Sequence, residues 1–220
     1  MQSEFYSEFA RVQMITQQIR AWDVLDGRVL EAMQRTPREE FVPERYAGVA
    51  FADADIPLRP GQHMLAPKIV GRLLQALDPQ PGMRALVVGA GTGYVAACMS
   101  AMGASVRAIE IDAALAAAAR TNLNRTGFGQ VEVVVGDTFN LDFGKDYAVI
   151  AVCGALPLYD DRFARALAVG GRLFVIVGAS QPQEALLVTR SAEQKWDSSA
   201  LFETSVDALD HAARPERFEF

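Results

Sequence analysis

The chain has 220 residues, of which 50% are hydrophobic, and a formal net charge of −6 at pH 7. This length suits one sizeable core with a small extension, and the acidic balance argues against a nucleic-acid partner, which would need a basic surface. No apolar run is long enough to span a membrane, and the polar, acidic start lacks the pattern of a signal peptide. We therefore expect a monomeric, cytoplasmic protein with no membrane partner.

The first part of the chain predicts helices followed by irregular structure. Apolar residues recur at helical spacing from about residue 4 to residue 35, and Pro37 indicates a helix stop or a new helix start. Residues 41–61 are rich in proline, glycine and aspartate, which is typical of irregular surface chain. We assign residues 1–60 to an extension that packs on the core and residues 61–220 to the main domain, the two forming one compact unit.

Strands and helices alternate in the rest of the chain. Near-continuous runs of valine, isoleucine and leucine are typical of a parallel sheet covered on both faces. The fold class is therefore predicted as α/β, a Rossmann-like doubly wound sheet that is mostly parallel and has a late antiparallel strand. The expected strands are 85–88, 106–111, 131–135, 147–152 and 172–177, with a late pair at 185–189 and 201–206, and the expected helices are 67–77, 94–102, 113–125 and 160–167.

A glycine-rich turn is the most informative motif. Gly89, Gly91 and Gly93 alternate after an apolar run, and Tyr94 opens a helical pattern. Glycine permits a sharp turn and a close approach of the backbone to a ligand. Tyr94 stands where a dinucleotide fingerprint has its third small residue, so the spacing favours S-adenosylmethionine over NAD. The alternative is a glycine turn in an α/β domain that binds no cofactor.

Two acidic residues follow the next two predicted strands. Glu110 and Ile111 end one strand at the distance where a βαβ unit brings a carboxylate to a ribose. Asp137 and Thr138 follow the next strand, where the aspartate is placed to accept a hydrogen bond from an adenine amino group; taken alone, Asp137 could equally be a turn aspartate. The predicted cofactor-binding residues are Gly89, Gly91, Gly93, Tyr94, Glu110, Ile111, Asp137 and Thr138.

Longer motifs show a family resemblance. They are MITQQIR at residues 14–20, PREEFVP at 37–43, and the GQ and AP pairs at 61–62 and 66–67. With them, nearly the whole chain resembles the protein-L-isoaspartate O-methyltransferases, and its body resembles class I S-adenosylmethionine-dependent methyltransferases. The resemblance implies S-adenosylmethionine as cofactor, isoaspartyl protein or peptide as substrate, and a role in protein repair.

The chain departs from the family pattern in the segment expected to bind the acceptor. Leu65 occupies the position of the serine that is usually assigned as catalytic, and Lys68 stands where the family often has an aromatic residue or histidine. Val87 replaces an acid before the glycine turn, and residues 152–157 differ from the usual run. His63 is a candidate replacement for the missing polar group, with a surface histidine as the alternative.

Other reactive side chains indicate no further chemistry. Cys98 and Cys153 are expected to be buried thiols rather than a disulfide. His211 lies in a polar tail with no partner cluster, so no metal site is indicated.

Three hypotheses follow from these observations. The favoured one is an isoaspartyl methyltransferase, since loss of one serine hydrogen bond costs about 1–3 kcal/mol, roughly 5- to 150-fold in rate, and need not abolish transfer to a carboxylate. The second is a methyltransferase with a different, more apolar acceptor. The third is a cofactor-binding protein that lacks turnover and acts through a partner, and an NAD-dependent enzyme is a distant fourth.

Overall fold

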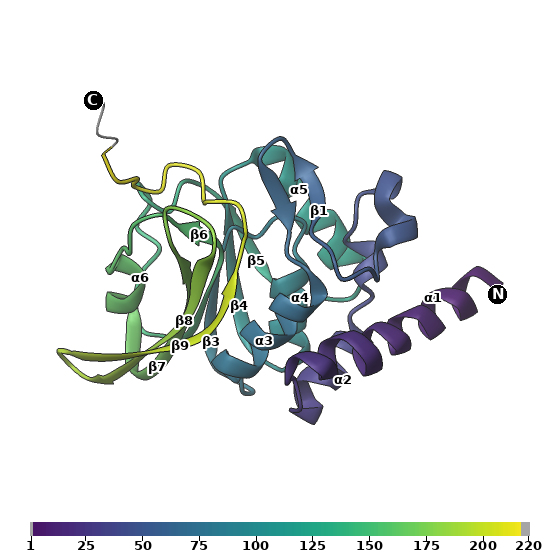
Figure 1. The fold of residues 1–220 in the computed structure, drawn as a ribbon, viewed down its shortest axis with the longest axis horizontal. Coiled ribbons are helices and arrows are strands. Elements are labelled where there is room, and N and C mark those ends of the chain that lie inside the picture. The colour runs from purple at the N-terminus through teal and green to yellow at the C-terminus, as the bar shows by residue number, and fades with distance from the viewer. Residues whose placement is uncertain (1, 217–220) are drawn as a thin grey trace.

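The structure of the protein is a computed structural model that describes residues 2–216. Its centre is a seven-stranded sheet in the order β5-β4-β3-β6-β7-β8-β9 (Figure 1). The first five strands of this order run parallel, and β8 and β9 are antiparallel to their neighbours. The predicted fold class is therefore confirmed. The strands are β3 (Arg84–Val88), β4 (Ser105–Glu110), β5 (Glu132–Val135), β6 (Tyr147–Leu156), β7 (Leu167–Val177), β8 (Gln183–Ala192) and β9 (Lys195–Thr204).

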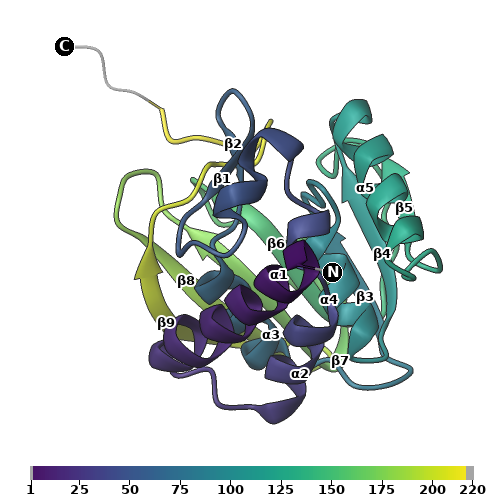
Figure 2. The ribbon, with the colours of Figure 1, turned by 90° about the vertical axis from the view of Figure 1, so that its right-hand side faces the viewer.

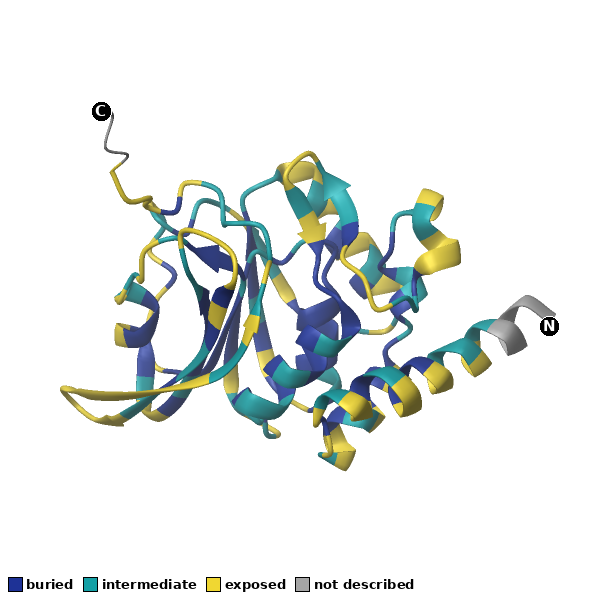
Figure 3. Cartoon of the chain, viewed as in Figure 1, coloured by how far each residue is buried: buried dark blue, intermediate teal, exposed yellow. Residues whose placement is uncertain are grey.

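Helices cover both faces of the sheet. The period of two along a strand separates the two cores: Ala85 and Val87 belong to one apolar cluster, and Leu86 and Val88 to the other. The first cluster lies under α3 (Pro67–Leu77), α4 (Tyr94–Ala101) and α5 (Ala113–Arg125), and the second lies under α6 (Arg162–Arg165). Figure 3 shows the buried residues concentrated in the central strands and the helices beside them.

The N-terminal helical segment is broken where the sequence pattern was continuous. Helix α1 (Gln2–Gln13) passes into a π-helical stretch (Met14–Ile19) and a short 3-10 turn, and α2 (Gly27–Arg35) follows separately. The break has a local cause, because Asp23 adopts a left-handed φ of 58° and the Asp26 side chain caps α2 by accepting from the Arg28 N–H. Met14 and Ile19 join the same apolar cluster as the sheet, so the extension shares the core of the main domain.

Part of the segment expected to be irregular forms a hairpin. Strands β1 (Ile56–Arg59) and β2 (Gln62–Met64) pair in antiparallel fashion, and Gly61, with a φ of 71°, provides the tight turn between them. The prediction was wrong here because strands of three or four residues are too short to show alternation. In Figure 2 this hairpin and the chain after β9 lie at the same end of the molecule.

The outer strands also differ from the prediction. β8 and β9 are both ten residues long, about twice what the apolar runs indicated, because each strand continues through exposed residues beyond its short apolar run. Helix α6 spans only four residues. Within residues 2–216, no helix combines the length and apolar character needed to cross a membrane.

The strand order locates a binding crevice. From β3 the chain builds outward to β4 and β5 on one side, and β6 then starts the other side. Ligands of open α/β sheets bind at such a switch point, outside the carboxyl ends of the strands. The glycine turn after β3 and the last residues of β6 flank this crevice.

Candidate active site

The glycine turn leaves β3 through three left-handed residues. Gly89, Gly91 and Gly93 have φ values of 73°, 54° and 97°, which residues with a Cβ rarely adopt. A Cβ on Gly93 would also lie 3.2 Å from Leu123, so this glycine permits close packing of the turn on α5. The turn therefore exposes backbone at the crevice and is held by helix packing behind.

Glu110 forms the floor of the crevice at the end of β4. Its carboxylate accepts from the Gly91 N–H at 2.7 Å and from the Asp112 N–H at 3.0 Å, and the residue is 5% exposed. Burial raises the pKa of this carboxyl, while the two N–H groups favour its ionised form. A carboxylate has about four acceptor positions, so capacity remains for two hydroxyl donors. The free acceptor positions of this carboxylate fit the two hydroxyl groups of a ribose.

Asp137 follows β5 at the same edge, and its carboxylate is already engaged. It accepts from the Phe139 N–H at 2.9 Å and from the Asn140 amide at 2.6 Å, and His211 Nδ1 lies 2.9 Å from its Oδ2. Burial opposes ionisation, yet the bonds from His211 and Phe139 hold the pKa of Asp137 below its usual value. His211, for which the sequence indicated no partner cluster, thus contacts a predicted adenine-binding residue. Thr138 is buried beside it and lines the same crevice.

The chain after β9 crosses the crevice. We call residues 207–212 the C-terminal strap. Its backbone bonds to β6, because the Ala155 N–H donates to the Asp207 carbonyl at 2.8 Å and the Leu209 N–H donates to the Ala155 carbonyl at 2.9 Å. Gln62 of β2 donates to the Ala208 carbonyl at 2.9 Å, so the strap is held from both sides.

Side chains of the strap lie against the glycine turn. Leu209 packs so closely on Gly89 that a Cβ at this glycine would lie only 3.0 Å from the leucine side chain. Asp210 forms an ion pair with Arg59. Leu209 and Asp210 both line two small cavities. One, of about 50 Å³, is also lined by Glu110 and Ile111, and the other, of about 20 Å³, is also lined by Ile111 and Asp137. The sequence did not predict the position of the strap, because a polar segment has no periodic pattern that indicates which part of the fold it contacts.

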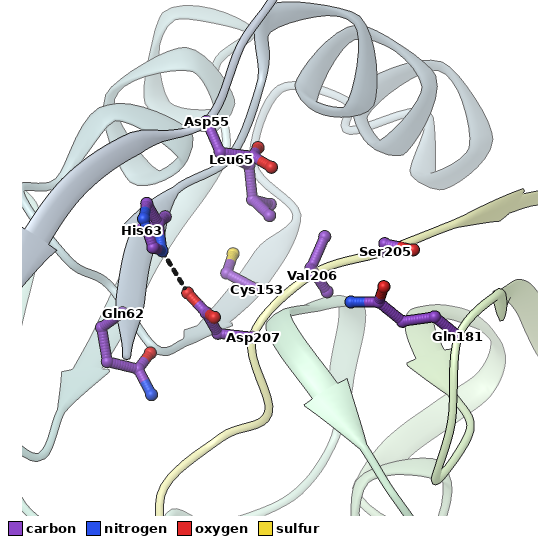
Figure 4. A pocket seen from close by; sticks show the side chains of 9 residues that line it. All are labelled: Asp55, Gln62, His63, Leu65, Cys153, Gln181, Ser205, Val206 and Asp207. Carbon is purple, nitrogen blue, oxygen red and sulfur yellow. Dashed lines mark hydrogen bonds and ion pairs between the residues drawn. The ribbon is translucent and has the colours of Figure 1, made fainter. Parts of the chain in front are cut away.

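A larger cavity of about 230 Å³, drawn in Figure 4, shares Gln62, His63 and Cys153 with the cavity of about 50 Å³. It is lined by Asp55, Gln62, His63, Leu65, Cys153, Gln181, Ser205, Val206 and Asp207. His63 Nδ1 lies 2.6 Å from Asp207 Oδ2, which joins β2 to the strap. Asp55 accepts from the Ala66 N–H at 2.8 Å, and burial raises its pKa. Leu65 is 6% exposed and contributes an apolar wall.

Arg38 supports this cavity from below, although the sequence analysis used it only as part of a family motif. It is fully buried; its guanidinium donates to the Ala50 and Leu65 carbonyls, both at 2.9 Å, and lies 5.0 Å from the centre of the Tyr94 ring. Tyr94, predicted to bind the cofactor, also packs its ring on Phe41, with 5.6 Å between centroids. The available signal was the place of this arginine in the family motif at residues 37–43.

Two further departures from the family pattern have different positions. Lys68 pairs with Asp53 at 2.8 Å and lies over the Trp22 ring, and it is not among the residues that line the cavity. Cys153 does line it, at a point where the pairing of β6 with β7 shifts register. Burial raises the pKa of Cys153 to about 12. Neither cysteine forms a disulfide, as predicted.

The sheet order, the glycine turn and the acids at successive strand ends place the protein among the class I methyltransferases. A solved protein-L-isoaspartate O-methyltransferase shares this fold, with a TM-score of 0.79 and 24% identity over 93% of this chain and 67% of its own. So does a Plasmodium falciparum protein in complex with S-adenosyl-L-homocysteine, with a TM-score of 0.78 and 18% identity over 91% of this chain and 98% of its own.

Sequence comparison establishes the family. The chain belongs to the protein-L-isoaspartate(D-aspartate) O-methyltransferase family, whose model matches residues 10–207. It is 42% identical to a protein-L-isoaspartate O-methyltransferase of Aeropyrum pernix, over 88% of this chain and 78% of that protein. It is 40% identical to one of Koribacter versatilis, over 83% of this chain and 82% of that protein. The predicted family is therefore confirmed.

Proposed function

We propose that the protein transfers a methyl group from S-adenosylmethionine to the carboxylate of an isoaspartyl residue in a damaged protein or peptide. The observation that carries this proposal is the junction of a nucleoside crevice with a separate 230 Å³ cavity, in a chain of this family. The crevice suits the methyl donor, and the cavity suits a side-chain-sized acceptor.

The residues of the crevice suit S-adenosylmethionine. Glu110 would hold the two ribose hydroxyls, and the glycine turn would lie against the body of the cofactor. Asp137 would accept from the adenine amino group, with Ile111 and Thr138 beside the base. When bound, the cofactor supplies a methyl group that is activated by the positive charge of its sulfonium.

The acceptor side has to position one oxygen. An isoaspartyl carboxylate is ionised at neutral pH and needs no activation, so the main task is to hold it in line with the methyl group at short distance. Leu65 gives no hydrogen bond for this purpose. Gln181 and Ser205, which line the cavity, contribute an amide and a hydroxyl instead. We expect transfer to be slower than in a relative that has the serine.

The setting of this activity is also a proposal. We infer that the protein acts as a monomer in the cytoplasm, on isoaspartyl proteins and peptides. Two free thiols, one of them fully buried, suit a reducing compartment. We further propose that residues 1–60 and 61–220 act as one unit, since residues from both parts build one apolar cluster.

The test is transfer of label from methyl-labelled S-adenosylmethionine to an isoaspartyl peptide, with the aspartyl isomer of that peptide as the matched control. We expect label in the isoaspartyl peptide alone, in a base-labile ester. Calorimetry with S-adenosylhomocysteine and with NAD is run in parallel. Binding of the first compound without any transfer would refute the enzymatic proposal and leave a cofactor-binding protein, and equal binding of NAD would refute the cofactor assignment.

A further inference from the structure

The acceptor cavity and the cofactor crevice meet at two side chains. Within residues 2–216, His63 and Cys153 are the residues that line the 230 Å³ cavity and also both cavities that touch Gly89 and Gly91. Methyl transfer requires the acceptor atom to come within about 3–3.5 Å of the methyl carbon, in line with the bond that breaks. The reaction therefore takes place beside these two residues.

Of the two, His63 is equipped to accept a proton. Burial raises the pKa of Cys153 to about 12, so its thiol stays protonated at neutral pH. His63 has its Nδ1 2.6 Å from the carboxylate of Asp207, as the dashed line in Figure 4 shows. A carboxylate that binds one ring nitrogen fixes the tautomer and leaves the other nitrogen as a base.

The charges around His63 do not favour an anionic acceptor. Asp55 and Asp207 both line the cavity, and no lysine or arginine is among its nine lining residues. The nearby cations are engaged elsewhere: Arg59 pairs with Asp112 and Asp210, Lys68 pairs with Asp53, and Arg38 bonds to backbone carbonyls. A neutral acceptor enters this cavity without repulsion from the two carboxylates, whereas an ionised carboxylate must offset that repulsion through contacts such as those with Gln181 and Ser205.

Methylation of an isoaspartyl carboxylate does not require a general base. The carboxylate carries no proton at neutral pH, so a histidine held by an aspartate would have no role in its methylation. The serine position is occupied by Leu65, which offers an apolar wall rather than a hydrogen bond. A proton acceptor and an apolar wall together suit an uncharged acceptor that must lose a proton as it reacts.

We propose that His63, oriented by Asp207, is a general base and that this site methylates a hydroxyl group as a further activity. The proposal rests on the methyl donor of the proposed function but not on its isoaspartyl acceptor. The hydroxyl oxygen forms a bond to the methyl carbon while the bond from that carbon to sulfur breaks. The sulfur keeps the electron pair and becomes a neutral thioether, and the hydroxyl proton passes to Nε2 of His63.

The test uses two acceptors that differ at one group. The first is an isoaspartyl peptide, and the second is the same peptide with a hydroxymethyl group in place of the isoaspartyl carboxylate. Phenol serves as a third acceptor, which distinguishes a small-molecule hydroxyl from one on a peptide. We expect wild-type protein to methylate at least one hydroxyl acceptor. The rate with that acceptor should increase with pH, because a general base must be unprotonated to act, while the rate with the isoaspartyl peptide stays nearly level.

Variants then identify the base. His63→Gln and Asp207→Asn should each slow transfer to the hydroxyl by about a hundredfold or more, and the loss should exceed that for the isoaspartyl peptide by at least about tenfold. His63→Gln should also abolish the rise with pH. Asp197→Asn on β9, a matched change at an exposed position, should leave both rates at wild-type values. Calorimetry with S-adenosylhomocysteine confirms that each variant is folded and binds the cofactor product.

The outcomes separate this proposal from the proposed function. If the protein methylates a hydroxyl acceptor but not the isoaspartyl peptide, the result supports His63 as the general base and refutes the isoaspartyl activity. If the protein methylates the isoaspartyl peptide but neither of the two hydroxyl acceptors, the proposal of a general base is overturned. Equal losses for both acceptor types in His63→Gln also overturn it, because the pair between His63 and Asp207 would then be structural.

Discussion

The cofactor crevice and the acceptor cavity are built in different ways. The crevice is formed by backbone and a few side chains at the ends of three neighbouring strands, with Glu110 locked by two backbone N–H groups. The cavity is formed by side chains from separate parts of the chain, including the β1–β2 hairpin, the end of β6 and the strap. A site fixed by the backbone resists change, whereas side chains on several segments can be exchanged one at a time. Leu65, which stands at the position of the family serine, and His63 are on the exchangeable side.

The largest effect should come from a substitution that disturbs both the cofactor crevice and the acceptor cavity. Arg38→Ala removes a fully buried side chain that supports Tyr94 and the Leu65 carbonyl, and it leaves two carbonyls without their donor. We expect the free energy of unfolding to fall by about 3–5 kcal/mol in urea denaturation. Arg35→Ala, at a side chain that is 68% exposed, should change it by less than about 0.5 kcal/mol. Similar values for the two variants would contradict this role of Arg38.

The next change affects the crevice alone. Glu110→Ala removes the acceptor for the ribose and for the Gly91 N–H. We expect the affinity for S-adenosylhomocysteine, measured by calorimetry, to fall by about 2–3 kcal/mol, on the order of a hundredfold. Glu132→Ala at the exposed start of β5 is the control and should bind like wild type. Unchanged affinity in Glu110→Ala would show that the ribose lies elsewhere.

A third change affects only the acceptor side. Leu65→Ser places a hydroxyl in the cavity wall, and we expect single-turnover methyl transfer to an isoaspartyl peptide to rise by about tenfold or more. Cofactor affinity should stay the same, because the crevice is untouched. The matched change Leu65→Ala removes the same bulk without adding a hydroxyl and should give no such gain. An equal rise in both variants would mean that space, and not the hydrogen bond, limits the wild type.

The smallest effect should come from the contact between His211 of the strap and Asp137 at the crevice. His211 contacts the Asp137 carboxylate, and its hydrogen bond to this carboxylate, followed by the negative charge of Asp137, raises the pKa of His211. The charged pair is therefore present below that pKa and is lost as the pH rises through it. If adenine competes for the same carboxylate, binding of S-adenosylhomocysteine should tighten a few-fold between about pH 6 and pH 8. His211→Ala should bind tightly at both pH values, and the same pH dependence in this variant would contradict the competition.

The sequence predicted that the crevice residues lie at one edge of the sheet, but it did not predict which residues form the cavity, for a physical reason. Strands of a parallel sheet end at one edge, so Gly89, Glu110 and Asp137 could be placed together from their order in the chain alone. The pair between His63 and Asp207 joins residues 144 positions apart, and nothing in local spacing reports such a contact. The same limit hid the β1–β2 hairpin and the strap, whose positions depend on tertiary contacts.

The strap has a kinetic consequence. Its Asp207 is the partner of His63 in the acceptor cavity, and its Leu209 and Asp210 lie against the crevice two and three residues later. The cavities beside the glycine turn, about 50, 30 and 20 Å³, are each far below the roughly 300 Å³ of a small-molecule pocket, so we expect the strap to shift when the cofactor enters. Asp207 lies in the same short segment as Leu209 and Asp210, so the position of this segment also sets the contact between Asp207 and His63. We expect that contact to be complete once the cofactor is seated, and the methyl donor therefore to bind before the acceptor.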